Sequence, residues 1–148
     1  MAVHYIPEGF RSITPYLKVK GASALIEFLR KAFDATVLFR MDMPDGTVAH
    51  ASIAIGDSMI ELADASERWP AMPCSLHFYL PDADAAYHRA IEAGATSLME
   101  PTTQFYGDRE GNVVDPFGNH WYLATHVEDV SDEQVNERAA AQMGGSQS

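Results

Sequence analysis

The sequence predicts an α+β fold in which one domain is made of two βαβββ modules followed by a C-terminal helix. Two observations lead to this prediction. Segments that alternate between apolar and polar residues, as strands do, surround two segments with apolar residues every three or four positions, as in helices. The order of these elements in the first half of the 148 residues then recurs in the second half, 60–61 positions later. Internal repetition of this kind indicates two copies of one structural unit.

The first module is predicted over residues 11–65. Its strands are predicted at 12–19, 36–43, 47–55 and 58–63, separated by turn-forming residues at 44–46 and 56–57. The first strand alternates so that Ile13, Leu17 and Val19 are expected to face the core. Residues 22–33 carry an apolar stripe at helical spacing. A segment with two prolines and no periodicity, 64–73, is expected to be a linker.

The second module is predicted over residues 72–127, with the same order of elements. Its strands are predicted at 75–80, 96–100, 107–115 and 119–126, and its helix at 82–93. Residues 128–148 form the third part of the domain. Ser131 and Gln134 have the spacing of a capping box, which predicts a helix that ends near Met143 before a frayed tail.

Composition narrows the possible partners and the location of the protein. The chain has 10 basic and 21 acidic residues, a net charge of −11, which repels nucleic-acid phosphates and argues against nucleic-acid binding. No apolar run approaches the ~18 residues of a membrane span, so no membrane association is expected. Cys74 is the only cysteine, so an internal disulfide is impossible and a cytoplasmic location is expected. Cys74 itself is expected to be structural.

Two segments of the second module resemble a known family. SLHFYLPDADAAYHRAIEAGAT opens the module and GDREGNVVDPFGNHWYLATHVEDVS closes it. Together with the repeated module, these segments resemble the vicinal oxygen chelate superfamily of glyoxalases, bleomycin-resistance proteins and extradiol dioxygenases, and most of all its PhnB-like branch. The resemblance covers residues 11–127. It implies that the eight strands form an open cup with the helices outside and a site inside. It also implies pairing of modules within or between chains, and we expect a homodimer that covers open strand edges.

Strand parity predicts which residues line such a cup. Leu17, Trp121 and Leu123 are expected to face the helices, together with Leu76 and Phe78. The opposite face is too polar for a dry core, because burying unpaired polar groups costs about 1–3 kcal/mol each. We therefore interpret that face, together with a rim residue, as the wall of a ligand pocket. The predicted pocket residues are Thr14, Tyr16, His50, Glu61, Ser75, His77, Tyr79, Arg109, His120 and Tyr122.

The resemblance also implies where a divalent metal would bind. Metal-binding members use His, Gln or Glu at the positions that correspond to Thr14, Glu61, Ser75 and Tyr122, and only Glu61 is an ordinary ligand. Because catalytic zinc usually needs three protein ligands, no cofactor is favoured. A shifted set of Glu61, His77 and His120 would suit iron, zinc or manganese and is kept as the alternative.

Three further side chains have alternative interpretations. Glu61 is the candidate catalytic base if the cup desolvates it; otherwise it pairs with Lys18 or a tyrosine hydroxyl. Arg109 either binds a substrate anion at the rim or pairs with Asp108 or Glu110. Trp69 either closes over the cup or holds the linker in place.

Two classes of function remain open on these grounds. The first is a protein that binds a small organic molecule, aromatic or amphipathic, by stacking on the tyrosines of the cup. The second is a metal-dependent lyase, isomerase or dioxygenase of the same superfamily with a non-standard ligand set. The missing metal ligands favour binding, whereas Glu61 and the two histidines keep an enzyme under consideration.

Overall fold

Eight strands and three helices make up the protein, as described for residues 2–145 by a computed structural model. The first module consists of β1 (Tyr16–Val19), α1 (Ala22–Phe33), β2 (Thr36–Asp42), β3 (Val48–Ile55) and β4 (Ser58–Asp64). The second consists of β5 (Ser75–Tyr79), α2 (Ala83–Glu92), β6 (Thr96–Thr103), β7 (Asp108–Val114) and β8 (His120–His126). The C-terminal helix is α3 (Asp132–Gly145). The predicted order of two βαβββ modules and a third helix is confirmed.

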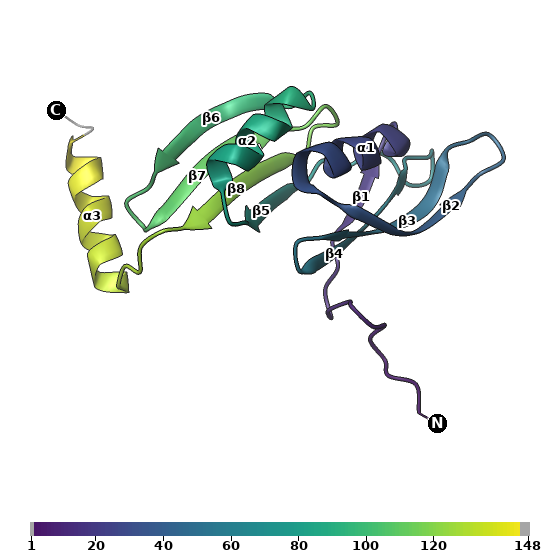
Figure 1. Cartoon of the computed structure of the whole chain (residues 1–148), viewed down its shortest axis with the longest axis horizontal. Coiled ribbons are helices and arrows are strands. Elements are labelled where there is room, and N and C mark those ends of the chain that lie inside the picture. The colour runs from purple at the N-terminus through teal and green to yellow at the C-terminus, as the bar shows by residue number, and fades with distance from the viewer. Residues whose placement is uncertain (1, 146–148) are drawn as a thin grey trace.

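Each module forms its own four-stranded sheet, and the two sheets have the same topology. Their strand orders are β1-β4-β3-β2 and β5-β8-β7-β6. In both, the first strand pairs in parallel with the fourth, and the other neighbours are antiparallel. The sheets lie side by side along the long axis of the molecule and stay open (Figure 1).

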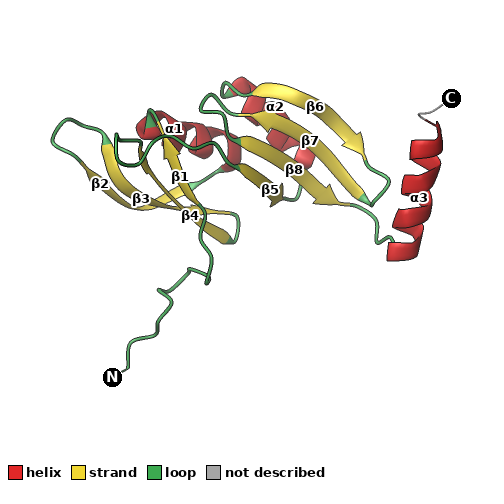
Figure 2. Cartoon of the chain, turned by 180° about the vertical axis from the view of Figure 1, so that it is seen from behind, coloured by secondary structure: helices red, strands yellow, loops and turns green. Residues whose placement is uncertain are grey.

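Helices α1 and α2 cover the same face of the two sheets and contact each other (Figures 1 and 2). The core lies beneath them. Leu17, Trp121 and Leu123 are buried there, and Leu76 and Phe78 pack against it at partial exposure. Phe33 of α1 contacts the rings of both Phe78 and Trp121, so one aromatic group joins the two modules. The predicted helix-facing side of the strands is therefore confirmed.

The start of the chain differs from the prediction. Ile13 was expected in the core, but 86% of its surface is exposed, and β1 begins only at Tyr16. Alternation predicts a buried side chain only where the residue is held in a sheet, and the chain leaves the sheet before Tyr16. Residues 2–13, the N-terminal arm, run away from the body of the protein (Figure 1).

Helix α3 stands at the far end of the second module (Figure 1). Its capping box is confirmed, because the Gln134 amide donates to Ser131 Oγ at 3.2 Å and the Ser131 amide donates to Gln134 Oε1 at 3.3 Å. Arg138 anchors the helix by donating to Glu128 Oε1 at 2.8 Å and to the Phe105 carbonyl at 2.9 Å. No helix within residues 2–145 is long and apolar enough to cross a membrane.

Candidate functional site

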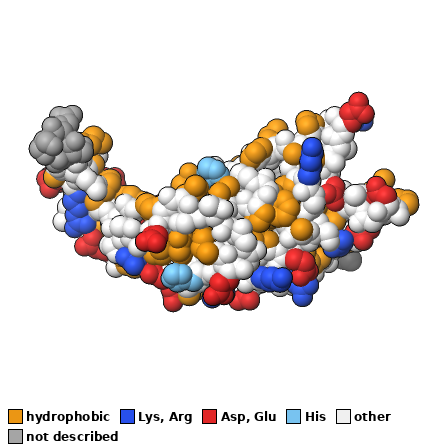
Figure 3. Space-filling model, turned by 90° about the horizontal axis from the view of Figure 1, so that it is seen from above, with side chains coloured by type: hydrophobic (Ala, Val, Ile, Leu, Met, Phe, Trp, Pro, Cys, Tyr) orange, Lys and Arg blue, Asp and Glu red, His pale blue; other side chains and the backbone are white. Residues whose placement is uncertain are grey.

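The sheet faces opposite the helices are open and together form a hollow. In the view from above, the outline on that side is concave between the two ends of the molecule (Figure 3). Large rings stand on these faces: Tyr16, Phe39 and Tyr79 are each exposed, with Phe39 at 53%. Exposed rings of this size on a concave surface offer stacking area to a ligand.

In the first module, Tyr16, His50 and Glu61 form one connected cluster. The Tyr16 hydroxyl lies 2.9 Å from His50 Nδ1, and His50 Nε2 lies 3.5 Å from Glu61 Oε1. Glu61 therefore pairs with a histidine, and the prediction that its partner is Lys18 or a tyrosine hydroxyl is wrong. Lys18 instead places its ammonium 4.2 Å from the centre of the Tyr16 ring. The Glu61 side chain is 27% exposed, so a molecule in the hollow can reach it.

Strand pairing explains why these three side chains meet. Tyr16 on β1 and Ser52 on β3 both lie opposite Glu61 on the central strand β4. His50 is two residues from Ser52 and so points to the same face of the sheet. The cluster thus joins three neighbouring strands, of which β1 is far from β3 and β4 in sequence.

In the second module, the carboxylate of Glu110 has three partners on the concave face. His77 Nε2 lies 3.2 Å from Glu110 Oε1, the Tyr106 hydroxyl donates to Oε2 at 3.3 Å, and Asn112 Nδ2 approaches Oε2 at 3.4 Å. Burial, followed by the negative charge of Glu110, raises the pKa of Tyr106 to about 12. The phenol therefore stays protonated and serves as a donor. The His77 ring also stacks on that of Tyr122, with centroids 6.3 Å apart.

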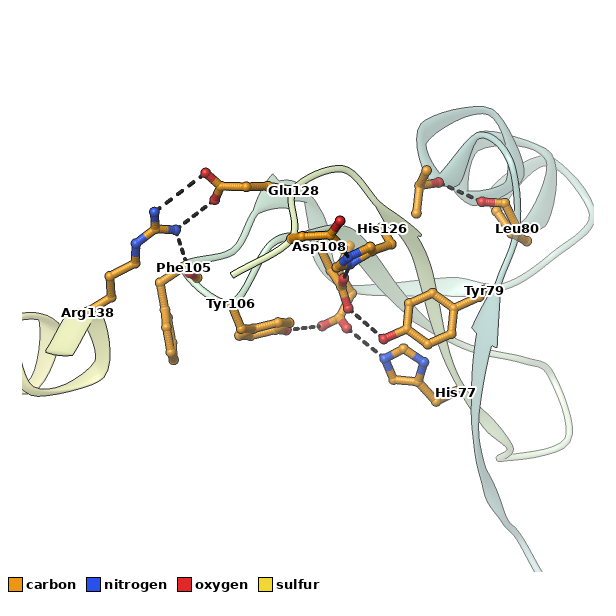
Figure 4. Close-up of polar contacts among 12 residues, drawn as sticks. His77, Tyr79, Leu80, Phe105, Tyr106, Asp108, His126, Glu128 and Arg138 are labelled. Atoms are coloured by element: carbon orange, nitrogen blue, oxygen red, sulfur yellow. Dashed lines mark hydrogen bonds and ion pairs between the residues drawn. The ribbon is translucent and has the colours of Figure 1, made fainter. Parts of the chain in front are cut away.

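A second buried carboxylate, Asp108, lies next to this group (Figure 4). It accepts from the Tyr79 hydroxyl at 2.8 Å and contacts His126 Nδ1 at 2.8 Å. His126 Nε2 in turn lies 2.7 Å from Asp129. These hydrogen bonds, first to Asp108 and then to Asp129, raise the pKa of His126. The hydrogen bond to Asp108 also raises the pKa of Tyr79.

Tyr106, Asp108, Glu110 and His126 were not among the pocket residues predicted from the sequence. A signal for two of them was present. Asp108 and Glu110 alternate along a predicted strand with apolar Val113 at the opposite parity, which is the pattern that identified the polar faces of the other strands. Tyr106 lies in the preceding turn, where periodicity carries no information about direction.

The internal repeat relates the clusters of the two modules. Tyr16 lies opposite Glu61, and His77, 61 positions after Tyr16, lies opposite Tyr122, 61 positions after Glu61. His50 corresponds to Glu110, because Ser52 pairs with Glu61 as Asn112 pairs with Tyr122. Each module therefore has one tyrosine, one histidine and one glutamate at three equivalent positions. The same three residue types occupy these positions in a different order in the two modules. We call these the equivalent triads: Tyr16, His50 and Glu61; His77, Glu110 and Tyr122.

Most of the predicted pocket residues lie in these clusters or line a cavity between the modules. The cavity has a volume of about 530 Å³, and Thr14, His77 and Tyr79 line it together with apolar groups. Glu61, His120 and Tyr122 are not among its lining residues. Among residues 2–145, no hydrogen bond or ion pair joins Glu61 to His77. Ser75 and His120 lie opposite each other at the start of β5 and β8.

Arg109 lies on the other side of β7. It donates from Nε and Nη2 to the two carboxylate oxygens of Asp84 on α2, at 3.0 and 2.9 Å. The prediction that it pairs with Asp108 or Glu110 is wrong, because those carboxylates point to the concave face and Arg109, at the opposite parity, points to the helix.

Cys74 and Trp69 belong to the linker and its end. Cys74 is half-buried, and this burial, more than the charge of Asp115, raises the pKa of its thiol and makes it less reactive. The Trp69 ring remains exposed, 5.9 Å from Lys18 Nζ, while its carbonyl accepts from the Ser66 amide at 2.8 Å.

Within residues 2–145, no three His, Cys, Asp or Glu side chains are grouped so that they could hold a metal ion. Glu61, His77 and His120 therefore do not form such a group within one chain.

A model of the glyoxalase/bleomycin resistance protein/dioxygenase superfamily matches residues 12–123. The chain belongs to this superfamily. The resemblance inferred from the two sequence segments is thus confirmed. A superfamily relative in sequence is the Mycobacterium tuberculosis H37Rv protein named Uncharacterized protein Rv0887c, which is 33% identical over 98% of this chain and 89% of its own length.

Solved structures share the fold of the superfamily. The Bacillus cereus PhnB protein, described as a putative 3-demethylubiquinone-9 3-methyltransferase, has a TM-score of 0.59 and 17% identity, with 78% of this chain and 99% of that chain covered. The fosfomycin resistance protein FosX from Mesorhizobium loti has a TM-score of 0.58 and 16% identity, with coverage of 78% and 91%. At these identities the similarity concerns the fold alone.

Proposed function

We propose that this protein binds a small organic molecule against the concave faces of its sheets, in a cup completed by a second copy of the chain. The observation that carries the proposal is the pair of equivalent triads on two open faces. Each triad combines a ring for stacking with a carboxylate that can accept hydrogen bonds, and no helix or strand within residues 2–145 covers either face (Figure 2). Such a combination of apolar surface with a few polar groups is typical of ligand sites.

The chemistry of the two faces favours a flat ligand that carries hydrogen-bond donors or positive charge. Tyr16 and Tyr79 offer exposed rings. The carboxylate of Glu61 is partly exposed and accepts hydrogen bonds, whereas Glu110 is held by its own partners. The net charge of −11 also favours cations over anions.

A second copy is proposed because β2 carries a row of exposed apolar residues at the open edge of its sheet. Leu38, Phe39 and Met41 are 58%, 53% and 52% exposed. An apolar edge strand of this kind is normally covered. Pairing with another chain would cover it and would also close the cup.

A binding titration tests the proposed site. Metal-free bleomycin and thioflavin T are suitable probes, because both are positively charged and contain flat conjugated rings. We expect at least one of them to bind, and Glu61→Gln to weaken its binding by about 1–3 kcal/mol, or roughly 5- to 150-fold, because a charged hydrogen bond is lost. Tyr122→Phe should weaken a polar contact of the other triad while it leaves stacking intact. Isothermal titration calorimetry measures each change.

Glu27→Gln is the matched control for this titration. Glu27 lies on α1, pairs with Arg30 at 3.1 Å and is exposed, so the same change of charge occurs away from the concave faces. Its affinity should equal that of the wild type. Equal weakening by Glu27→Gln and Glu61→Gln would mean that only net charge matters, and it would contradict the proposed site.

Two further measurements address the assembly and the chemistry. Light scattering coupled to size-exclusion chromatography should give twice the mass of the 16.3 kDa chain, and Phe39→Glu should shift it toward the monomer. Elemental analysis of protein purified without added metal or chelator separates simple binding from a metal-dependent reaction. The single cysteine supports a cytoplasmic location for this activity.

A further inference from the structure

We infer that the cavity between the modules is the binding site of the chain's own N-terminal arm, and that Ile13 enters it when the arm closes. In this closed state the arm adds two residues to the start of β1 and runs along the free edge of β5. The inference is independent of the ligand proposed above. It follows from a difference between the two modules in the segments that lead into their first strands.

The second module shows how such a segment is held. The linker before β5 runs beside β1, where the Met72 amide donates to the Lys18 carbonyl at 3.1 Å. The chain then joins its own sheet, since the Cys74 carbonyl accepts from the His120 amide at 2.9 Å and Ser75 pairs with His120. Cys74 packs against the core.

The internal repeat specifies the corresponding positions in the first module. The repeat relates Met72 to Arg11 and Cys74 to Ile13, each 61 positions earlier. It also relates the partner of Met72, Lys18, to Tyr79. The partner of Cys74, His120, corresponds to Met59. Among residues 2–145 of the structure, no backbone hydrogen bond joins Arg11 to Tyr79 or Ile13 to Met59. β5 begins at Ser75, which corresponds to Thr14, whereas β1 begins two residues later than Thr14, at Tyr16. The chain of the first module thus joins its sheet two residues later than the chain of the second module does.

The cavity lies where the arm is detached. Arg11, Ile13 and Thr14 line one side, and Leu76, Phe78 and Trp121 line the other. The lining is mainly apolar, and the most exposed large apolar side chain next to it is Ile13, at 86%. An isoleucine gains about 1.5–3 kcal/mol when it is fully buried, and this gain offsets part of the conformational entropy that the arm loses when it becomes ordered.

The backbone offers matching partners for the closed arm. The Glu61 amide donates to the Pro15 carbonyl at 2.9 Å, and the amide of Met59, two residues earlier on β4, points to the same side. In the closed state the Met59 amide donates to the Ile13 carbonyl, as the His120 amide donates to Cys74. The outer edge of β5 likewise receives Arg11 opposite Tyr79, so an exposed strand edge is covered.

Thermal unfolding tests whether Ile13 is buried. Ile13→Ala should lower the melting temperature by about 4–8 °C, the usual result of removing a buried isoleucine from a domain of this size. Val3→Ala is the control, because Val3 is 93% exposed and has no place in the cavity; its melting temperature should be unchanged. Equal melting temperatures for the wild type and both variants would overturn the closed state.

Amide exchange measured by NMR then identifies which chain supplies the arm. The Met59 amide should exchange at least about tenfold more slowly in the wild type than in Ile13→Ala, because only the wild-type arm protects it. Labelled Ile13→Ala protein mixed with unlabelled wild type should keep fast exchange if each arm closes on its own chain. Restored protection in the mixture would show that the arm of a second copy enters the cavity and would overturn the proposal. Fast exchange of Met59 in the wild type would also overturn it.

Discussion

The two modules use the same positions for opposite purposes. In the first module the carboxylate of the triad, Glu61, is 27% exposed and has a histidine partner. In the second, Glu110 is 8% exposed and is surrounded by His77, Tyr106 and Asn112. A buried carboxylate must be satisfied by hydrogen bonds, so Glu110 is committed to holding its own face together. Glu61 retains accessible surface for a ligand. A repeated fold can thus keep one half rigid while the other stays available.

The same contrast appears at the turns before the last strand of each module. The first module uses a short turn with an exposed Asp57, whose only side-chain hydrogen bond among the described residues comes from Ser58. The second uses Asp115, which is buried and accepts from the amides of Phe117 and Asn119, from Asn119 Nδ2 and from Trp121 Nε1. Four donors converge on this one carboxylate.

The largest expected effect follows from this turn. Asp115→Ala should lower the free energy of unfolding by about 3–4 kcal/mol, because it leaves several buried donors without an acceptor. Asp57→Ala, at the corresponding turn of the first module, should change it by less than about 0.5 kcal/mol. Urea denaturation measures both. Similar losses for the two variants would contradict the contrast between the turns.

The start of each helix provides the next comparison. Asp64, on β4, accepts from the amides of Gly21, Ala22 and Val48, whereas the equivalent residue on β8, Thr125, accepts only from the amide of Ala83. Burial acts to raise the pKa of Asp64, but the three amide donors outweigh it and the pKa is lowered.

Asp64→Ala should therefore cost about 2–3 kcal/mol of stability, and Thr125→Val about 1–2 kcal/mol. The free energies of unfolding of the two variants, measured in urea under the same conditions, give the ranking. A larger loss of stability for Thr125→Val than for Asp64→Ala would contradict the idea that the charge of the acceptor and the number of its amide donors set these contributions.

The triads themselves should respond differently to loss of charge. Glu110→Gln should lower stability by about 1–2 kcal/mol, because a neutral amide is a weaker acceptor for His77 and Tyr106. Glu61→Gln should change stability by less than about 0.5 kcal/mol, because Glu61 and His50 are both partly exposed and lie 3.5 Å apart, at the limit of a direct interaction. Chemical denaturation of both variants tests the comparison. A larger effect at Glu61 would reverse the roles assigned to the two modules.

The smallest effect is a dependence on pH that belongs to the second module. The hydrogen bonds to Asp108 and Asp129 raise the pKa of His126, whereas the first module has Val48 and Ala65 at the positions of Asp108 and His126. A raised pKa means that the protonated ring stabilises the fold below the unfolded value of about 6.5 and that this contribution is lost as the pH rises through the folded value.

Replacement of the ring should remove this dependence. The stability difference between wild type and His126→Asn should be largest near pH 6 and should shrink toward pH 9. Urea midpoints measured at several pH values provide the comparison. A difference that grew with pH would show that the neutral ring is the stabilising form.

The sequence alone determined the order of the elements, the repeat and the faces of most strands. These features are local: alternation and helical spacing depend on neighbours two to four positions away, and each helix-facing residue such as Leu17 or Leu123 obeys them. The capping box at Ser131 and Gln134 is local in the same way. Because the second module repeats the first, the predicted elements of the two modules supported one another.

Only the tertiary structure decided which polar groups meet. Glu61 is 11 positions from His50, and Arg109 is 25 from Asp84, and nothing in the sequence favours these partners over nearer ones. Pairs of this kind depend on strand register and on how a helix lies across a sheet, which are set by the packing of the whole core. The exposure of Ile13 has the same origin. Its alternation predicts a buried side chain, but the segment must first be held in the sheet, and that depends on contacts with the other module.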